Sequence, residues 1–539
     1  MGERSGEGRI LVASNRGPVS YRLDDDGRLS ARRGGGGLVS GLSSVAGQAD
    51  TLWVCAALGD ADRAAVRGAP GGRIGLDGKP GGSGVRMLDI PPATFQRAYN
   101  AVANSTLWFV HHMLYDTPSK PHFGISFRRE WESYQAYNRA FAEALAEEAG
   151  PRPASTGPAS TGPADSGPAS TEGTGAGTAP ARAMVQDYHL TLVPRMLADL
   201  RPDVAIAHFS HTPWAPPDYY RMLPDEVGRE VLEGILGADH AGFLSQRWAD
   251  SFADCCEAIL GAQVDRARQQ VTHRGHVTGI GVHPLGVDAA RLTRRAAQPD
   301  VQARIAALAE TAGGRKLIVR IDRTELSKNI VRGLAAYREL LISYPQWRGR
   351  VVHLAFAYPS RHDLPEYREY TARVQRMATE INEEFGSEDW DPLILQVDDD
   401  YPRSLAAYRL ADVLLVNPVR DGMNLVAKEG PVLSDQGCAL VLSGESGAAA
   451  QLADQALIIN PFDISATAQA LHQALLMPDS ERKRRTAALA KAAAALPPGQ
   501  WLADQLAALD NRAGAPRGRA SWLSGAGRTG RRRARSAGR

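Results

Sequence analysis

Short apolar runs alternate with amphipathic stretches along most of the chain. Runs such as "DVAIAHFS", "KLIVRID", "RVVHLAFA" and "DVLLVN" are almost continuously apolar, and stretches with helical periodicity separate them. Continuous apolar strands that alternate with helices are typical of parallel sheets covered on both faces. The pattern therefore predicts an α/β fold built from doubly wound, Rossmann-like sheets.

The alternation restarts after "HVTGIGVHPLGVDAARL", and a second series of strands begins at Lys316. A chain of 539 residues is too long for one ordinary hydrophobic core. We therefore predict two Rossmann-like domains in tandem, over residues 8–288 and 289–510. An Arg-rich tail over residues 511–539 is predicted to be disordered.

Residues 151–182 interrupt the first series with a near-repeat of "PASTG". Pro, Ala, Ser, Thr and Gly offer little apolar surface to bury, so this segment is predicted to be a disordered insertion. The strand and helix pattern resumes at once in "AMVQDYHLTLVPRMLADL". The insertion is therefore placed inside the first domain and not at a domain boundary.

Polar segments follow several of the predicted strands. In doubly wound sheets, ligands bind beyond the carboxyl ends of the strands. Two sheets that present these ends to each other would form an interdomain cleft, and we predict the active site there. The segments are "SNRGP", "QDYHL", "HFSHTPW", "RIDRTELSKN", "AYPSR" and "NPVRDGMNLVAKEG".

Charge and composition argue against several classes of protein. The chain carries a net +2, but residues 511–539 hold nine Arg and no acidic residue, so residues 1–510 carry −7. An acidic folded part argues against nucleic acid as the main partner. No apolar run approaches the roughly 18 residues that span a bilayer, no export signal is visible, and four scattered cysteines do not form a disulfide framework. We expect a cytoplasmic protein without membrane contact.

The segment "NPVRDGMNLVAKEG" concentrates charge where a buried strand ends. A helix that begins near Gly422–Asn424 would direct free N–H groups and the positive end of its dipole toward a phosphate. Gly422 permits close approach of a ligand, Asp421 could accept hydrogen bonds from sugar hydroxyls, and Glu429 could hold a ribose diol. A helix cap with a solvated charge pair is the alternative, and the spacing alone leaves both open.

Two basic residues in "RIDRTELSKN" extend this hypothesis. Arg320 is predicted to end a strand and Lys328 to lie in the loop or helix start that follows. A guanidinium fork and a compact ammonium suit a diphosphate whose leaving oxygen gains charge, whereas surface ion pairing is the alternative. Only seven of the 62 basic residues are Lys, which makes Lys328 notable.

Two further strand ends carry candidate polar groups. His208 and His211 are three residues apart, but no third ligand cluster accompanies them, so hydrogen bonding in a sugar pocket is favoured over a metal site. Asp187 in "QDYHL" is either a carboxylate at the edge of the sheet or a helix N-cap.

In their order, the motifs resemble the trehalose-6-phosphate synthase family, retaining glycosyltransferases of the GT-B type with two facing Rossmann-like domains. The resemblance implies transfer of glucose from UDP- or GDP-glucose to glucose 6-phosphate, giving α,α-trehalose 6-phosphate, without a metal or other cofactor. It spans roughly residues 9–480. The similar segments are "SNRGPV", "GGGGLVSGL", "AYNAVANSTLW", "VQDYHLTLVP", "HTPW", "GADHAGF", "RIDRTELSKN", "VRDGMNLVAKEG", "VLSGESGAAAQL" and "INPFD".

The resemblance also implies roles for individual residues. Asp187, His211, Arg320, Lys328 and Asp421 are implied to be catalytic. The reaction implied uses no protein nucleophile: the leaving phosphate oxygen takes the proton of the acceptor hydroxyl, and the protein supplies positioning and charge stabilisation. The implied acceptor contacts are Arg16, Tyr99, Trp108, Asp187 and Arg361. The implied donor contacts are Gly37, His211, Arg320, Lys328, Asp421, Gly422, Met423, Asn424, Leu425 and Glu429.

The chain departs from the family pattern in three places: Ala56 stands where a second Trp is usual, the spacing from Arg320 to Lys328 is longer, and the 151–182 insertion is foreign. Two alternative functions are therefore kept. One is a related glycosyl- or pseudo-glycosyltransferase that uses glycerol 3-phosphate or a cyclitol phosphate. The other is a non-catalytic subunit that binds a sugar nucleotide. The nucleobase of the donor is open, and a homo-oligomer is expected.

Overall fold

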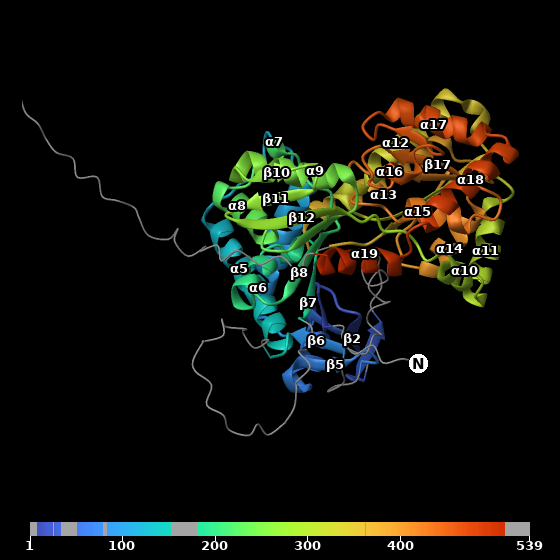
Figure 1. Cartoon of the computed structure of the whole chain (residues 1–539). Helices are drawn as coiled ribbons and strands as arrows, with labels where there is room; N and C mark the ends of the chain where they lie inside the picture. Colours follow the sequence, from blue (N-terminus) through green and yellow to red (C-terminus); the bar gives the residue numbers. More distant parts are fainter. Residues whose placement is uncertain are drawn as a thin grey trace, which may run out of the picture.

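The computed structural model describes residues 8–24, 26–33, 51–78, 84–151, 180–361 and 363–511. The predicted donor contact Gly37, nearly all of the predicted insertion and nearly all of the predicted tail lie outside these residues. Two α/β units lie beside each other (Figure 1).

The first unit contains a ten-stranded sheet with the order β10-β11-β12-β9-β8-β7-β1-β4-β6-β5. Its central strands, from β12 to β6, are parallel, and antiparallel partners lie only at the two edges. The strands are β1 (Ile10–Ala13), β4 (Thr51–Ala56), β5 (Arg73–Gly75), β6 (Gly84–Leu88), β7 (Arg182–Gln186), β8 (Ala205–Ser210), β9 (His240–Phe243), β10 (Gln263–Asp265), β11 (Gln270–His273) and β12 (His276–Val282). A separate hairpin pairs β2 (Val19–Leu23) with β3 (Leu29–Arg33).

The second unit contains a six-stranded sheet, entirely parallel, with the order β15-β14-β13-β16-β17-β18. The strands are β13 (Lys316–Arg323), β14 (Val351–Tyr358), β15 (Leu393–Gln396), β16 (Val413–Val416), β17 (Ala439–Ser443) and β18 (Leu457–Ile459). Every residue of β16 and β17 is buried, as expected for strands covered on both faces. Both sheets confirm the predicted α/β class.

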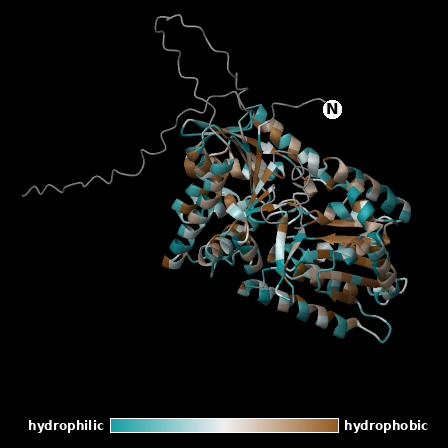
Figure 2. Cartoon of the chain, turned by 90° about the horizontal axis from the view of Figure 1, so that it is seen from below, coloured by the Kyte–Doolittle hydropathy of each residue, from teal (hydrophilic) through white to brown (hydrophobic). Residues whose placement is uncertain are grey.

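Helices connect and cover the strands, and Figure 2 shows hydrophobic residues concentrated in the strands. The main helices of the first unit are α2 (Asp60–Arg67), α3 (Pro92–Gln96), the π-helix η2 (Arg97–Leu107), α4 (Trp108–His112), α5 (Ile125–Glu148), α6 (Val193–Leu200), α7 (Pro217–Tyr220), α8 (Asp225–Ile235) and α9 (Gln246–Cys255). Those of the second part of the chain are α10 (Ala289–Ala296), α11 (Pro299–Ala312), α12 (Ile330–Ser343), α13 (Pro365–Phe385), α14 (Tyr401–Leu410), α15 (Val426–Leu433), α16 (Ala449–Leu452), α17 (Ile464–Leu476), α18 (Asp479–Ala494) and α19 (Pro498–Asp510). Across the described residues, no helix combines the length and apolar character that crossing a bilayer requires.

The last helix, α19, packs against the sheet of the first unit, although it follows the second unit in the sequence. Trp501 on α19 lies edge-on against Phe209 of β8, with ring centroids 4.9 Å apart, and Asp510 pairs with Arg182 of β7 at 3.3 Å. Figure 1 shows α19 beside β8. The predicted domain boundary at 289–510 is therefore wrong for this helix, because helical periodicity does not reveal which sheet a helix covers.

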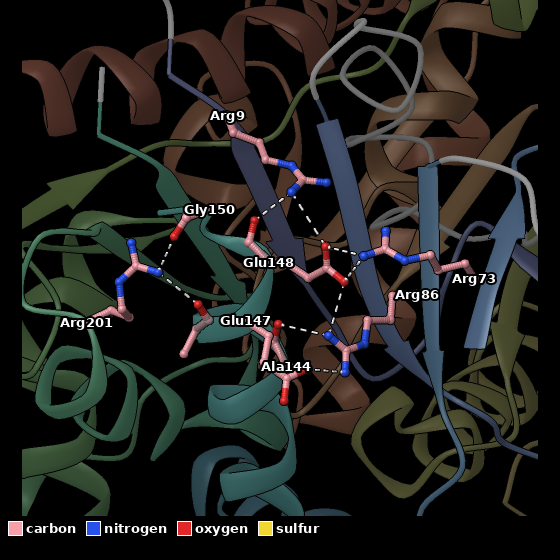
Figure 3. Close-up of polar contacts among 9 residues, drawn as sticks. Arg9, Arg73, Arg86, Ala144, Glu147, Glu148, Gly150 and Arg201 are labelled. Atoms are coloured by element: carbon pink, nitrogen blue, oxygen red, sulfur yellow. Dashed lines mark hydrogen bonds and ion pairs between the residues drawn. The ribbon is translucent and has the colours of Figure 1, made fainter. Parts of the chain in front are cut away.

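The end of α5, just before the insertion, is anchored by a buried carboxylate (Figure 3). Glu148 is 3% exposed and accepts hydrogen bonds from Arg73 at 2.7 Å and Arg86 at 3.1 Å, while Arg9 donates to its backbone oxygen at 2.6 Å. Arg201 donates to the backbone oxygen of Gly150 at 2.9 Å. Arg9, Arg73 and Arg86 thus tie the helix end to the start of β1, to β5 and to β6, and Arg201 ties it to the end of α6.

Candidate functional site

The two units meet at Gly422, where backbone packs against backbone. A Cβ atom at Gly422 would lie 1.9 Å from the carbonyl oxygen of His211, so only glycine fits there. Trp248 of α9 donates from Nε1 to the Gly422 oxygen at 3.0 Å. A Cβ atom at Gly447 would lie 1.8 Å from that same oxygen. Segments that are far apart in the sequence, "HTPW", "RDGMN" and "SGESG", are thus joined at the domain junction.

Lys328 and Asp421, both predicted to face the sugar donor, form an ion pair beside this junction. The distance from Nζ to Oδ2 is 2.6 Å, and the side chains are 16% and 14% exposed. Asn424, in the left-handed backbone region at φ 75°, also donates to Asp421, at 3.1 Å. Burial lowers the pKa of Lys328, but Asp421 and the other carboxylates nearby raise it above its ordinary value overall. The ammonium is therefore charged and held at the junction.

Arg320 does not contact this junction, and its predicted role in clamping a diphosphate is wrong. Its side chain is 0% exposed. It donates to Asp322 at 2.7 Å and to the backbone oxygens of Lys328 at 3.2 Å and Ile330 at 3.4 Å. A Cβ atom at Gly333 would lie 2.2 Å from the guanidinium, so that glycine makes room for it. Arg320 is therefore a buried support for the loop that carries Lys328.

Arg323, which sequence reasoning missed, is the arginine that this strand exposes. It is the last residue of β13, its side chain is 56% exposed, and its Nη1 lies 3.3 Å from Oε1 of Glu325. It precedes Lys328 by five residues, whereas Arg320 precedes it by eight. The unexpectedly long spacing from Arg320 was the signal that could have identified Arg323.

Glu325 is a second missed residue and joins the basic groups. Its side chain is buried and accepts a hydrogen bond from Ser360 at 2.9 Å. Burial raises the pKa of this carboxyl, but Arg323, Arg361 and Lys328 lower it overall to about 2. An ionised carboxylate is therefore fixed among three cations, one of which is a predicted acceptor contact.

The predicted acceptor contacts form an aromatic and basic group on the other side of the junction. The guanidinium of Arg361 lies 4.1 Å from the ring centroid of Trp108, a cation–π contact. Arg361 also donates to the hydroxyls of Tyr367 at 2.6 Å and Tyr188 at 3.1 Å. Arg361 comes from the second domain and Trp108 from the first, so this group exists only where the domains meet.

Tyr99 and Arg16 extend the group through one histidine. Tyr99 stacks on His189, with ring centroids 5.5 Å apart. The pKa of His189 is lowered by burial and then by the charges of Arg361 and Arg16. Arg16 itself is exposed. The structure thus brings four predicted acceptor contacts together, Tyr99, Trp108, Asp187 and Arg361, and the charge of the fifth, Arg16, acts on His189.

Asp187 and His211 connect the two sides. Asp187 has φ 73°, and its Oδ1 accepts the backbone N–H of His211 at 3.1 Å. Burial raises the pKa of Asp187 to about 6, against the opposing effect of backbone N–H groups and of Arg361. His211 Nε2 lies 2.9 Å from Oε1 of Gln186, and burial lowers the pKa of His211 to about 3. The neutral imidazole of His211 and the Asp187 carboxyl, whose pKa is raised, are therefore linked through the His211 backbone N–H.

Helix α15 begins later than predicted, at Val426, so Gly422–Leu425 precedes it. Met423 is held by its backbone oxygen, which accepts from Ser446 Oγ at 2.8 Å and from the Ala448 N–H at 2.8 Å. The predicted backbone contacts Met423, Asn424 and Leu425 therefore form the turn that leads into the helix.

The remaining charged residues of this segment, Arg420, Lys428 and Glu429, make contacts within the protein. Glu429 accepts a hydrogen bond from Tyr408 at 3.2 Å, and burial raises its pKa to about 7. Lys428 is fully buried and donates to the Leu285 oxygen at 2.6 Å. Arg420 lies 4.8 Å from the ring centroid of Trp248. Lys428 thus joins α15 to the segment after β12, and Arg420 joins the second domain to α9 of the first.

His208, inside β8, and His211, just after it, do not share a partner. His208 Nε2 lies 3.4 Å from the Asp187 backbone oxygen, whereas His211 bonds to Gln186. Within the described ranges, no group of three or more His, Cys, Asp and Glu side chains is placed to hold a metal ion.

Comparisons with known proteins place this geometry in context. A family model described as glycosyltransferase family 20 matches residues 180–511. The chain is 30% identical over 498 residues to a UDP-forming α,α-trehalose-phosphate synthase of Schizosaccharomyces pombe, covering 89% of this chain and 86% of that protein. It is 31% identical over 495 residues to a bifunctional trehalose-6-phosphate synthase/phosphatase of Thermoproteus tenax, covering 89% of this chain but only 60% of that protein's length.

A solved structure shows a similar fold. The E. coli trehalose-6-phosphate protein bound with UDP-2-fluoro glucose superposes with a TM-score of 0.77 at 25% sequence identity. The match covers 94% of this chain and all of the other. The similarity therefore includes both domains and their junction.

Proposed function

The chain belongs to glycosyltransferase family 20 and has the two-domain GT-B architecture, and from that premise we propose that it is an α,α-trehalose-phosphate synthase. The reaction is transfer of glucose, with retention, from a nucleotide-diphosphate glucose to glucose 6-phosphate, giving α,α-trehalose 6-phosphate. One observation carries the proposal: a charged pair, Lys328–Asp421, and an aromatic–basic group around Arg361 lie on either side of Asp187 and His211 at the domain junction.

The donor proposed is UDP-glucose. Relatives are named as UDP-forming, and the E. coli structure is described as bound with UDP-2-fluoro glucose. Lys328 and Arg323 supply the positive charge that a diphosphate needs, Lys328 as a point charge and Arg323 as a fork. When Lys328 turns to the diphosphate, Asp421 is released to accept hydrogen bonds from sugar hydroxyls. Glu429, where α15 begins, would hold the ribose.

The acceptor proposed is glucose 6-phosphate. Arg361 and Arg16 would grip its phosphate, and the Trp108 and Tyr99 rings would line the pocket. Asp187 is held by the His211 N–H on the donor side and adjoins Tyr188, which contacts Arg361 on the acceptor side. Its carboxylate would therefore accept a hydrogen bond from the sugar hydroxyl that attacks.

The chain's own groups account for the chemistry mainly by positioning. The leaving phosphate oxygen takes the proton of the attacking hydroxyl on the same face, so retention needs no protein nucleophile. Lys328 and Arg323 stabilise the charge that develops on that oxygen. Because these two cations can neutralise the diphosphate, we infer that no metal is required. A cytoplasmic location and a homo-oligomeric state stay predictions; Cys55, Cys255, Cys256 and Cys438 are all buried without disulfides.

Product formation tests the proposal directly. Glucose 6-phosphate would be offered with UDP-, GDP- or ADP-glucose in separate reactions that contain EDTA. Trehalose 6-phosphate is expected, with UDP-glucose the best donor. If the chain binds UDP-glucose but forms no product with glucose 6-phosphate, the acceptor assignment is wrong, and glycerol 3-phosphate and cyclitol phosphates become the acceptors to try.

Asp187 should give the reaction a dependence on pH. Because burial raises its pKa to about 6, the carboxylate forms as pH rises through that value, and kcat/KM for glucose 6-phosphate should rise with it. The acceptor phosphate also titrates near pH 6, with a second pKa of about 6. Asp187→Asn serves as the control because it keeps the titration of the phosphate. The ratio of wild-type to Asp187→Asn rates should increase between pH 5 and 7; a constant ratio would exclude this role.

A further inference from the structure

Gln186, the last residue of β7, is buried directly against His211. Its side chain is 1% exposed, and its Oε1 lies 2.9 Å from His211 Nε2. The amide nitrogen of Gln186 has no hydrogen-bond partner among the described residues. Among the described residues, the Gln186 side chain therefore makes one hydrogen bond, the one to His211.

This contact determines where the imidazole proton lies. An amide oxygen only accepts hydrogen bonds, so His211 Nε2 must donate and must carry the proton. The ring is neutral because burial, with a smaller effect of His208, lowers its pKa to about 3. A neutral imidazole has one proton, so Nδ1 has a free lone pair, and no partner for Nδ1 occurs among the described residues.

Neighbouring groups also pack around the His211 ring. The His211 backbone N–H is tied to Asp187 at 3.1 Å. The ring lies 4.7 Å from the ring centroid of Phe209 and 5.7 Å from that of Trp501 on the returning helix α19. Gln186, Phe209 and Trp501 thus hold one orientation of His211.

We propose that Gln186 is a positioning residue that fixes the Nε2–H tautomer of His211, so that His211 offers a hydrogen-bond acceptor to a hydroxyl group of the bound donor sugar. This inference rests on the proposed function. It adds to that function because it states the direction of the hydrogen bond that His211 makes. The histidine accepts a hydrogen bond from a neutral sugar hydroxyl and does not donate one to the diphosphate. The diphosphate is left to Lys328 and Arg323.

The chemistry of residue 186 matters to this role. A carboxylate there would raise the pKa of His211 and favour imidazolium, which has two donors and no lone pair. An apolar side chain would leave the tautomer unset. A neutral amide, oriented with its oxygen toward the ring, both selects the tautomer and preserves the neutral ring.

The tautomer can be observed without any assay of transfer. Protein labelled with ¹⁵N in the histidine rings would be examined by NMR, with the His211 signals identified by their loss in His211→Asn. A protonated Nε2 and an unprotonated Nδ1 are expected in the wild type. The opposite assignment would show that the amide nitrogen of Gln186 faces the ring, and it would overturn the proposal.

Two variants connect the tautomer to substrate. Gln186→Met removes the acceptor at similar side-chain length, and the signals of both tautomers are expected. The Kd for UDP-glucose should rise by about three- to tenfold, the loss of roughly one hydrogen bond, while the KM for glucose 6-phosphate should be unchanged. Gln186→Glu should restore the Kd for UDP-glucose only at pH values at which the NMR spectra show a neutral His211 ring. The other titratable groups that face the ring, Asp187 and His208, are unchanged in both variants.

A control variant separates this effect from the loss of an amide hydrogen bond elsewhere in the first domain. Gln135 of α5 is partly buried and also makes one side-chain hydrogen bond, to Glu230 at 2.7 Å, which involves no residue of the domain junction. Gln135→Met should leave both the His211 tautomer and UDP-glucose binding at wild-type levels. An unchanged Kd in Gln186→Met would refute the proposal. Absence of transfer in the wild type, with the predicted tautomer and the predicted change in Kd, would refute the proposed function alone.

Discussion

Replacing Lys328 by Met should slow glucosyl transfer by about 10²–10³-fold, the usual consequence of removing one group that stabilises a developing oxyanion. Lys328 is held at the domain junction by Asp421 at 2.6 Å and is the compact cation nearest to the proposed sugar site. Asp421 keeps its hydrogen bond from Asn424 and some exposure to water in the variant, so the fold should survive. The measurement is kcat with UDP-glucose and glucose 6-phosphate, together with thermal unfolding.

The same strand offers a matched control. Lys316, at the other end of β13, forms an ion pair of the same kind with Asp412, at 2.7 Å. Lys316→Met removes the same side chain and breaks a similar pair far along the strand from Lys328. It should leave kcat near the wild-type value. Equal losses of rate in the two variants would mean that Lys328 acts through stability and not at the site.

Much of the fold followed from the apolar runs. Strands such as β14 and β16 are buried along their length, and their Val-, Leu- and Ala-rich sequences allow few other structures. The ends of these strands also predicted where polar segments would come together, because the carboxyl edge of a parallel sheet collects the segments that follow each strand. His211, Asp187, Lys328 and Asp421 were predicted in this way, and the structure places all four at the domain junction.

The choice between two arginines could not be made from the pattern. "KLIVRID" was expected to end at Arg320, but β13 continues to Arg323. Residues two apart in a strand point to the same face, so Arg320 and Asp322 form an internal pair, and the strand continues although it contains two charges. A charge that is neutralised by a partner in the same strand looks like a strand end in a sequence, and only the pairing reveals that it is interior.

Other differences have the same origin in tertiary contacts. Helix α15 begins at Val426 because Met423 and its neighbours bond to Ser446 and Ala448 and not to the helix. The burial of Lys428 depends on the Leu285 carbonyl, which is more than a hundred residues away in the sequence. Neither partner is visible in a local window.

Arg320 and Arg323 should respond to substitution in opposite ways. Replacing Arg320 should lower the stability of the fold, whereas replacing Arg323 should slow transfer. Arg320→Met leaves Asp322 buried without its partner, so the free energy of unfolding should fall by about 3–5 kcal/mol. Arg323 is more than half exposed, and its partner Glu325 keeps Ser360 and the charges of Lys328 and Arg361 in Arg323→Met, so that free energy should fall much less than in Arg320→Met. Its effect should instead fall on transfer, with a loss of about 10²-fold. Urea unfolding and steady-state rates on both variants distinguish the two roles.

A double variant determines whether the effect at Arg320 comes from the buried pair. In Arg320→Met/Asp322→Leu both charges are absent, and replacing a buried ion pair by apolar residues of similar size is often neutral. This variant should recover most of the stability that Arg320→Met loses. If it also recovers transfer, Arg320 supports the loop by structure alone, since a group that touched the diphosphate could not be replaced by Met. If Arg320→Met were instead as stable as the wild type and defective only in binding UDP-glucose, Arg320 would have to move out of the core to contact the donor.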